Sequence, residues 1–253
     1  MATFAVKLGT YALGTDAAVS AIDIITSRRI SQSPIIRSNM TIIPEGKMQP
    51  LKISLKGTLV GSDYTSFRTA LANLRSILEV SKQDFYLDDE RFTRVIHTGL
   101  DYSFVTTDFC NYAVNFLGEL PYWLNVGTSY HTTVPTTAVS YPLNNSGDAR
   151  IPLKIVLSAP QATTISDNIQ FENLTLGLLC KYRGLLGTGQ TLVIDSGYDA
   201  NNVPTFKVEL DGVDAMSAFE GDFMAVTTGT NWVEYTGAAV GTFTAYWRQG
   251  YSA

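Results

Sequence analysis

Three adjacent acidic residues, Asp88, Asp89 and Glu90, are the first candidates for chemistry in this chain. Cleavage of a glycosidic bond requires two carboxyl groups on opposite sides of that bond, roughly 5 to 10 Å apart. Neighbouring residues of a strand point to opposite faces, so they rarely share one substrate. A Ca²⁺ loop requires further oxygen ligands at alternating positions and a glycine, and only part of that pattern is present. We therefore predict a solvated hairpin, or an ion-pair partner for Arg91 or Arg94.

The sequence does not predict that either histidine forms a metal or catalytic site with these acidic residues. Neither His97 nor His131 has a companion at the spacing of zinc ligands. A Ser-His-Asp triad assembled from distant positions remains open, but no Gly-x-Ser-x-Gly nucleophile motif occurs. The glycine-rich run at 184–189 has no lysine and precedes a predicted strand, so it reads as a loop rather than a phosphate-binding element. We predict a non-enzymatic protein without metal or cofactor.

Composition narrows the function classes further. The 253 residues suffice for two domains or one large β domain. Only 16% of residues are charged, below the usual quarter, which fits either a surface covered by partners or a β surface rich in Thr, Ser and Asn. The net charge is −5 and no stretch concentrates cations, which argues against a nucleic-acid partner. No apolar run has the length of a membrane span, and residues 1–14 do not fit a signal peptide, so we expect synthesis in the cytoplasm.

The two cysteines, Cys110 and Cys180, lie one in each half of the chain and within apolar, strand-like runs. They show no CxxC or Cys/His spacing. We predict that both are buried thiols, since free cysteine is among the most frequently buried residues. A disulfide between the two halves is the alternative.

The first half contains one predicted helix among short strands. Asp63 is a suitable N-cap for a helix over 63–79, in which Phe67, Leu71, Leu74 and Leu78 fall on one face. Residues 51–57 alternate between apolar and polar types, as a half-buried strand does. The segment 31–50 is too long for a turn, and we expect 40–43 to pair within it. It reads either as an extended arm that reaches a neighbouring subunit or as a surface loop.

The second half reads as strands and turns. A Thr-, Ser- and Gly-rich stretch with Pro135, residues 127–140, predicts a linker and hence domains at 1–135 and 136–253. Asp211-Gly212 has the composition of a tight hairpin turn. Evenly spaced strands separated by such turns favour a β-sandwich of the jelly-roll kind. The predicted strands cover residues 151–157, 169–174, 190–194, 206–210, 223–226, 232–235 and 242–247.

Taken in order, these motifs resemble those of the siphophage distal tail protein (Dit) family over most of the chain. The first half carries the helix at 63–79, followed by Phe85–Phe92, Asp101–Val105 and Leu120–Trp123. The second half carries Asn144–Asp148, Ile151–Ile155, Gly189–Asp195, Leu210–Gly212, Gly221–Met224, Thr228–Asn231 and Tyr235–Gly237. Many relatives have Pro-Gly-Thr-Asn at the turn where Thr228 stands here, so this turn departs from the family pattern. Each motif alone is weak, and their shared order is fairly specific.

The resemblance implies a mostly β protein with an N-terminal α+β ring (belt) domain and a C-terminal galectin-like β-sandwich. It implies a structural virion protein that forms a hexameric ring at the tail tip after assembly in the host cytoplasm. The implied partners are the major tail tube protein, the tail-tip hub or tail-associated protein, and receptor-binding proteins. A heterologous ring contact requires apolar anchors. Our candidates are Ile35, Ile42, Ile43, Phe85, Tyr86 and Phe92, with packing in the core as the alternative for each aromatic.

A lectin-like module that binds glycans is the alternative function. Sugar sites combine an aromatic platform with polar side chains, which Trp232 and Trp247 would supply. Both lie in predicted strands, so packing in the core or at a domain interface is the alternative for each. Galectin sites also use a His and Arg cluster, and no histidine follows His131. That absence argues against sugar binding by the usual galectin route.

Overall fold

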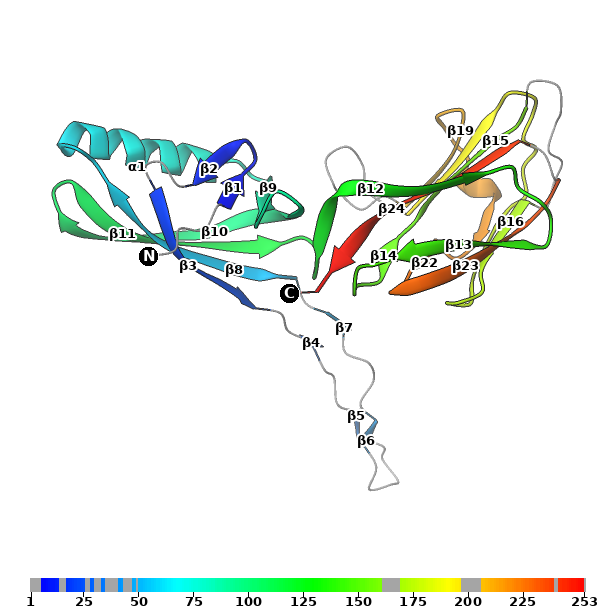
Figure 1. The fold of residues 1–253 in the computed structure, drawn as a ribbon, viewed down its shortest axis with the longest axis horizontal. Coiled ribbons are helices and arrows are strands. Elements are labelled where there is room, and N and C mark those ends of the chain that lie inside the picture. The colour runs from blue at the N-terminus through cyan, green and yellow to red at the C-terminus, as the bar shows by residue number, and fades with distance from the viewer. Residues whose placement is uncertain are drawn as a thin grey trace. The chain divides into compact units, whose positions relative to one another are not determined.

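A computed structural model describes residues 6–13, 17–25, 28–29, 33–34, 41–42, 47–48, 50–160, 169–196, 206–238 and 241–252. Within these ranges the chain is mostly β strand with a single α-helix, which confirms the predicted mostly β class. The chain forms two compact units (Figure 1). Unit 1 comprises residues 1–126 and 252–253, and unit 2 comprises residues 127–251.

Unit 1 is built on an antiparallel sheet in the order β3-β8-β11-β10-β9-β1-β2. Along β8 every second side chain is buried, from Ile53 through Leu55 to Leu59, because alternate residues of a strand face the same side. The strands are β1 (Val6–Leu8), β2 (Tyr11–Leu13), β3 (Ala17–Ile25), β8 (Lys52–Val60), β9 (Gln83–Tyr86), β10 (Arg91–Thr106) and β11 (Phe109–Gly118).

The helix α1 (Tyr64–Leu78) lies along one face of this sheet (Figure 1). Its buried residues include Phe67, Leu71, Leu74 and Leu78, so the predicted apolar face is confirmed. Asp63 is the N-cap, as predicted: its Oδ1 accepts from the Ser66 backbone N–H at 2.8 Å, and the Asp63 N–H donates to Ser66 Oγ at 3.0 Å. This reciprocal pair satisfies two backbone donors that the start of a helix leaves open.

We expect Asp63→Ala to lower the melting temperature at neutral pH by a few degrees, because the cap bond is lost. The hydrogen bond from Ser66 holds the pKa of the Asp63 carboxyl below its ordinary value. The ionised cap therefore stabilises the folded chain above that ordinary value, and this contribution is lost as the pH falls through the folded pKa. Thermal melts between pH 7 and pH 3 would show the difference from wild type shrinking. Asp63→Asn, which keeps an acceptor without the charge, should show no such convergence.

Two short ladders are formed within residues 28–48. The strand β4 (Arg28–Arg29) pairs with β7 (Lys47–Met48), and β5 (Ser33–Pro34) pairs with β6 (Thr41–Ile42). The expected pairing within this segment is thus confirmed for Thr41 and Ile42.

Unit 2 contains two antiparallel sheets. One has the order β12-β24-β15-β18-β19-β20 and the other β13-β23-β16-β17-β21, with β14 and β22 forming a separate pair. The core between them is rich in aromatic residues, and the Phe171 and Phe243 rings stack at 5.2 Å. The first sheet contains β12 (Trp123–Thr133), β15 (Lys154–Ser158), β18 (Thr191–Asp195), β19 (Lys207–Leu210), β20 (Val213–Asp214) and β24 (Thr242–Tyr251). The remaining elements are β13 (Val139–Asn145), β14 (Ile151–Pro152), β16 (Ile169–Asn173), β17 (Leu178–Tyr182), β21 (Phe219–Gly221), β22 (Ala225–Val226), β23 (Gly229–Thr236) and the 3₁₀ turn η1 (Met216–Ala218).

Two of the turn motifs are held by buried asparagines. Asn145 accepts from the Gly147 N–H at 3.0 Å and donates to the Ala149 carbonyl at 3.0 Å. A Cβ on Gly147 would lie 2.1 Å from the Gly250 carbonyl oxygen, so only glycine fits there. Asn231 accepts from the Thr227 N–H at 2.9 Å and donates to the Thr227 carbonyl at 2.7 Å. Asn231 therefore closes the turn that contains Thr228.

The boundary between the units differs from the predicted one at residue 135. The strand β12 continues to Thr133 and β13 begins at Val139, so most of the predicted linker is strand. Threonine favours strands because it is β-branched, and its abundance here signals a strand rather than a linker. The chain passes from unit 1 to unit 2 at Val126 and Gly127, within β12.

Both cysteines are free and fully buried, Cys110 in unit 1 and Cys180 in unit 2, as predicted. Burial raises the pKa of the Cys110 thiol, and it raises that of Cys180 to about 12. Both groups are therefore neutral thiols at physiological pH.

Candidate assembly surfaces

The distal half of β10 offers an open strand edge in unit 1. One side of β10 pairs with β11 from Val95 to Thr106, whereas the other side pairs with β9 only up to Val95. Within the described part of the chain, residues 96–106 therefore have one edge without a neighbouring strand. Asp101 is the single Asp, Glu, Lys or Arg in this span, and the span contains no proline. Natural proteins usually blunt a long edge with charge or proline, or cover it.

The strand β3 is the outermost strand at one end of the same sheet. It pairs with β8 along one side, and no described strand lies on its other side. Its sequence, Ala17–Ile25, contains one charged residue, Asp23, and no proline. A shift of register at Ser20 interrupts the ladder, as shifts near residues 98 and 105 do in β10. Unit 1 thus presents two long open edges, on β10 and on β3, in addition to that of the short terminal strand β2.

An exposed apolar cluster, which we call the hairpin patch, lies at the end of β10. Its members are Tyr102, Phe104 and Val105, which are 40%, 57% and 55% exposed. The Phe104 ring lies 5.9 Å from Phe67 of α1, and the Arg75 guanidinium lies 5.1 Å from the Tyr102 ring centroid. Figure 1 shows the β10–β11 turn at the same end of unit 1 as the start of α1. Clustered exposed aromatic and aliphatic side chains are typical of protein–protein contact sites.

The acidic corner is a structural turn, as predicted. Asp88 accepts from the backbone N–H of Glu90 at 2.9 Å and from that of Arg91 at 2.6 Å. It also accepts from Arg91 Nε at 2.9 Å and Nη2 at 2.6 Å. Partial burial opposes ionisation of Asp88, but the hydrogen bonds from Arg91 and Glu90 outweigh it and hold its pKa below the ordinary value. Asp89 pairs instead with Lys7 at 2.5 Å. Asp88 thus closes the β9–β10 turn, and Asp89 links this turn to β1.

The two histidines lie in different units. His97 lies in unit 1 against Phe116, and His131 lies in unit 2 against Tyr141. Among the residues that the structure describes, no three His, Cys, Asp or Glu side chains come together as metal ligands would. No helix in that part of the chain has the length and apolar character to cross a membrane.

The structure corrects two of the predicted ring anchors. Phe85 and Phe92 are 0% and 2% exposed, so they fill the core of unit 1 and do not reach a neighbouring subunit. Strand alternation places both side chains on the buried face, where Phe85 contacts Phe116 and Trp123. Tyr86 is half-buried beside Phe92 and stays a candidate. Ile42 is described in its backbone pairing alone, and Ile35 and Ile43 lie outside the described residues.

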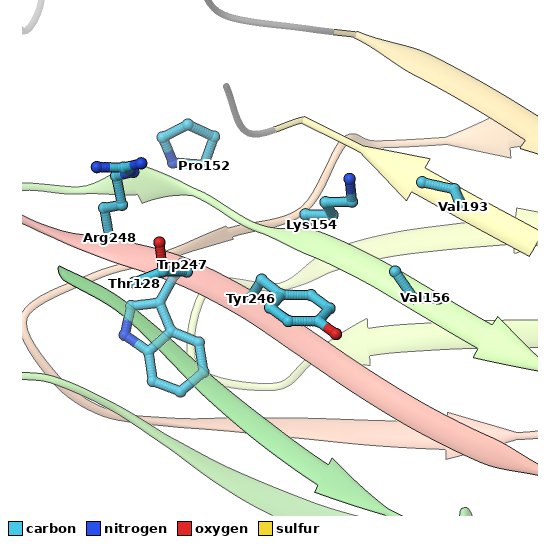
Figure 2. A pocket seen from close by; sticks show the side chains of 8 residues that line it. All are labelled: Thr128, Pro152, Lys154, Val156, Val193, Tyr246, Trp247 and Arg248. Atoms are coloured by element: carbon cyan, nitrogen blue, oxygen red, sulfur yellow. The ribbon is translucent and has the colours of Figure 1, made fainter. Parts of the chain in front are cut away.

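The two tryptophans proposed as glycan contacts have different environments in unit 2. Trp232 is 47% exposed on β23, whereas Trp247 is 7% exposed on β24, where the packing alternative holds. Trp247 also lines a pocket of about 360 Å³ (Figure 2). The pocket residues are Thr128, Pro152, Lys154, Val156, Val193, Tyr246, Trp247 and Arg248. Trp232 is absent from this set, so the structure does not bring the two tryptophans into one site.

The comparisons with known proteins add a fold relationship. No protein-family model and no curated protein matches the chain. Among solved structures it is similar to the SPP1 Dit (gp 19.1) protein, described as a paradigm of the hub adsorption apparatus in phages that infect Gram-positive bacteria. The two share 14% sequence identity over 98% of this chain and 99% of that one, with a TM-score of 0.75. A chain of the phage P2 baseplate in its activated conformation with Ca matches at 8% identity over 97% and 98% of the two chains, with a TM-score of 0.47. The chain thus has the fold of the SPP1 Dit protein along nearly its entire length.

Proposed function

We propose that this chain is a non-enzymatic hub protein of a phage tail tip, which forms a ring between the tail tube and the host-adsorption apparatus. The observation that carries the proposal is the fold shared with SPP1 Dit, a hub protein, over both units and without a large unmatched segment. The ordered sequence motifs of the distal tail family, present in both halves, support the same assignment.

The two long open edges of unit 1 give the proposed ring a physical basis. A ring requires two different surfaces on each subunit, because a heterologous contact repeats by rotation until it closes. The free edge of β10 on one subunit and the β3 edge of the next are such a pair. Their backbone N–H and C=O groups would complete an antiparallel or parallel ladder between subunits. The hairpin patch would lie beside this contact and contribute the apolar anchors.

The same proposal assigns partners and location. Unit 1 would contact the major tail tube protein, and unit 2, a galectin-like sandwich in this proposal, would face the tail-tip hub, tail-associated and receptor-binding proteins. The assembled protein would reside at the virion tail tip after assembly in the host cytoplasm. Its low fraction of charged residues agrees with a surface that is largely covered by partners.

Light scattering after size exclusion, with negative-stain images of the main peak, tests the proposal directly. We expect closed rings of about six subunits, the count implied by the family resemblance, with cyclic symmetry. A species that remains monomeric at every concentration, and also after addition of the cognate tube protein, would contradict the ring. Discrete dimers with two-fold symmetry would contradict it too, since they require a self-complementary contact rather than two different edges.

A further inference from the structure

The sheet β13-β23-β16-β17-β21 of unit 2 carries an apolar row on its outer face. Its inner side chains, among them Phe171 and Tyr235, are buried in the core, so the residues that alternate with them point outward. Trp232 lies opposite Pro142 on β13, and on its other side its carbonyl accepts from the Leu174 N–H at 2.9 Å. Trp232 and Leu174 are 47% and 48% exposed, and Pro142 is exposed as well. Three neighbouring strands thus present an apolar row to solvent.

A pair of carboxylates lies beside this row on the same face. Glu234 follows Trp232 by two positions on β23, and Glu172 precedes Leu174 by two positions, so strand alternation turns both outward. The register places Glu172 directly opposite Glu234. Residues in such positions have Cβ atoms about 5 Å apart, and like charges there repel each other. Both glutamates are partly exposed, so the repulsion is present at the surface of the folded chain.

Neither carboxylate is neutralised within the part of the chain that the structure describes. There, no ion pair and no side-chain hydrogen bond involves Glu172 or Glu234. Lys181, on the neighbouring strand β17, lies opposite Gln170 rather than opposite Glu172. Other cations of unit 2 are paired elsewhere: Lys154 with Asp195, Arg183 with Glu220, and Lys207 with Glu209. The outer face therefore keeps two adjacent negative charges beside an exposed indole.

This combination selects an occupant by its chemistry. A guanidinium group is planar, stacks on aromatic faces and pairs with carboxylates through parallel N–H groups, which a lysine ammonium does not do. Trp232 and Glu234 are two residues apart on one strand, about 7 Å, so a single arginine side chain can contact both. A small cation would leave the apolar row uncovered, and a neutral sugar on Trp232 would leave the two carboxylates uncompensated. A protein surface that carries arginine next to aliphatic side chains satisfies both rows.

We infer that this outer face docks an arginine-bearing, aliphatic surface of another protein, with the guanidinium group between Trp232 and the pair of Glu172 and Glu234. The identity of that protein rests on the proposed function, under which it is a further component of the tail tip. The recognition chemistry does not, because it follows from the charges and exposure of the face itself. Every residue involved belongs to unit 2 of one chain, so docking does not require ring formation.

A pentapeptide probe, acetyl-Leu-Ser-Arg-Ser-Leu-amide, tests the inference on the full-length chain. In an extended conformation its arginine and both leucines lie on one side, as the two rows require. The comparison peptide has citrulline in place of arginine, which keeps the shape and removes the charge. We expect titrations followed by saturation-transfer NMR to show that the citrulline peptide binds at least about threefold more weakly. The advantage of arginine should shrink when the salt concentration is raised to about 0.5 M.

Substitutions on the face assign the two parts of the recognition. Trp232→Ala should weaken the binding of both peptides, because it removes the platform that they share. Glu172→Gln and Glu234→Gln should each reduce the difference between the peptides while leaving the citrulline peptide unaffected. Glu220→Gln is the matched control: it makes the same change of charge on the same sheet, but Glu220 already pairs with Arg183 at 2.5 Å. The preference for arginine should persist in that variant.

Equal binding of the two peptides, or no binding of either, would overturn the inference. A preference for arginine that survives the combined substitution of Glu172 and Glu234 by glutamine would overturn it too. Melting curves give an independent check, since each glutamine variant should melt at or above the temperature of the wild type once the repulsion is relieved. A lower melting temperature would show that the carboxylate already has a partner within the chain, against the inference. The peptide titration and the light-scattering test of the ring can each fail without the other.

Discussion

Val105→Glu should convert the proposed ring into monomers without unfolding the chain. Val105 belongs to the hairpin patch and is 55% exposed in the single chain, so the folded subunit tolerates a carboxylate there. A surface substitution of this kind changes the free energy of unfolding by about 0.5 kcal/mol or less. In the assembled ring the same carboxylate would be buried without a counter-charge, at a cost of about 3 kcal/mol or more per subunit contact. Each contact would then weaken by over roughly a hundredfold.

Val213→Glu provides the matched control for this prediction. Val213 is 69% exposed on β20 and belongs to unit 2, so it is part of neither open edge of unit 1, and the same chemical change should leave the ring intact. Light scattering on the two variants at equal concentration distinguishes them. Rings that persist in Val105→Glu, with an unchanged melting temperature, would place the subunit contact elsewhere and remove the hairpin patch from the proposal.

Trp123→Ala should produce the largest loss of stability among single substitutions in unit 1. Trp123 is 1% exposed, and its ring lies 5.8 Å from that of Phe85. Truncation removes the buried apolar surface and leaves a cavity that the surrounding strands fill only in part. We expect the free energy of unfolding to fall by about 3–5 kcal/mol, which is a large part of the stability of an ordinary domain. Urea titration followed by far-ultraviolet circular dichroism measures the change without depending on tryptophan emission.

Trp232→Ala serves as the comparison, since Trp232 is 47% exposed. Its effect should remain within about 0.5 kcal/mol, as is usual for surface positions. Similar losses in the two tryptophan variants would mean that burial within the core does not account for the role of Trp123.

Local patterns in the sequence were sufficient for the elements that depend on neighbouring residues. The helix with its cap at Asp63 and its apolar face was predicted, because both signals lie within one or two turns. The Asp211-Gly212 turn was also predicted: both residues have positive φ, at 51° and 80°, which this composition favours. The region 127–140 was misread because its threonines and serines occur in linkers and strands alike. The pairing of β12 with β24 is set by residues more than a hundred positions away.

Residues at the candidate surfaces were harder to predict than the fold. Phe85 and Phe104 look alike in sequence, since both are aromatic residues in apolar strands. The structure buries Phe85 under neighbouring aromatics, whereas Phe104 lies near the end of a hairpin and is 57% exposed. Exposure thus depends on where a strand runs past its neighbours, which requires the sheet register. The pocket of unit 2 likewise combines Lys154 with Tyr246, which only the pairing of β15 and β24 brings together.

The two buried thiols, Cys110 and Cys180, allow the local opening of each unit to be measured by chemical labelling. Alkylating reagents react with the thiolate, and burial both shields Cys110 and Cys180 and keeps them protonated. Modification must therefore wait for a transient opening of the strand that carries each cysteine. Because each unit holds one cysteine, mass spectrometry of a labelling time course would give a separate opening rate for each unit, free or within an assembled tail. If the proposed role at a phage tail tip is correct, the same shielding would spare the protein from oxidative cross-linking outside the reducing host cytoplasm.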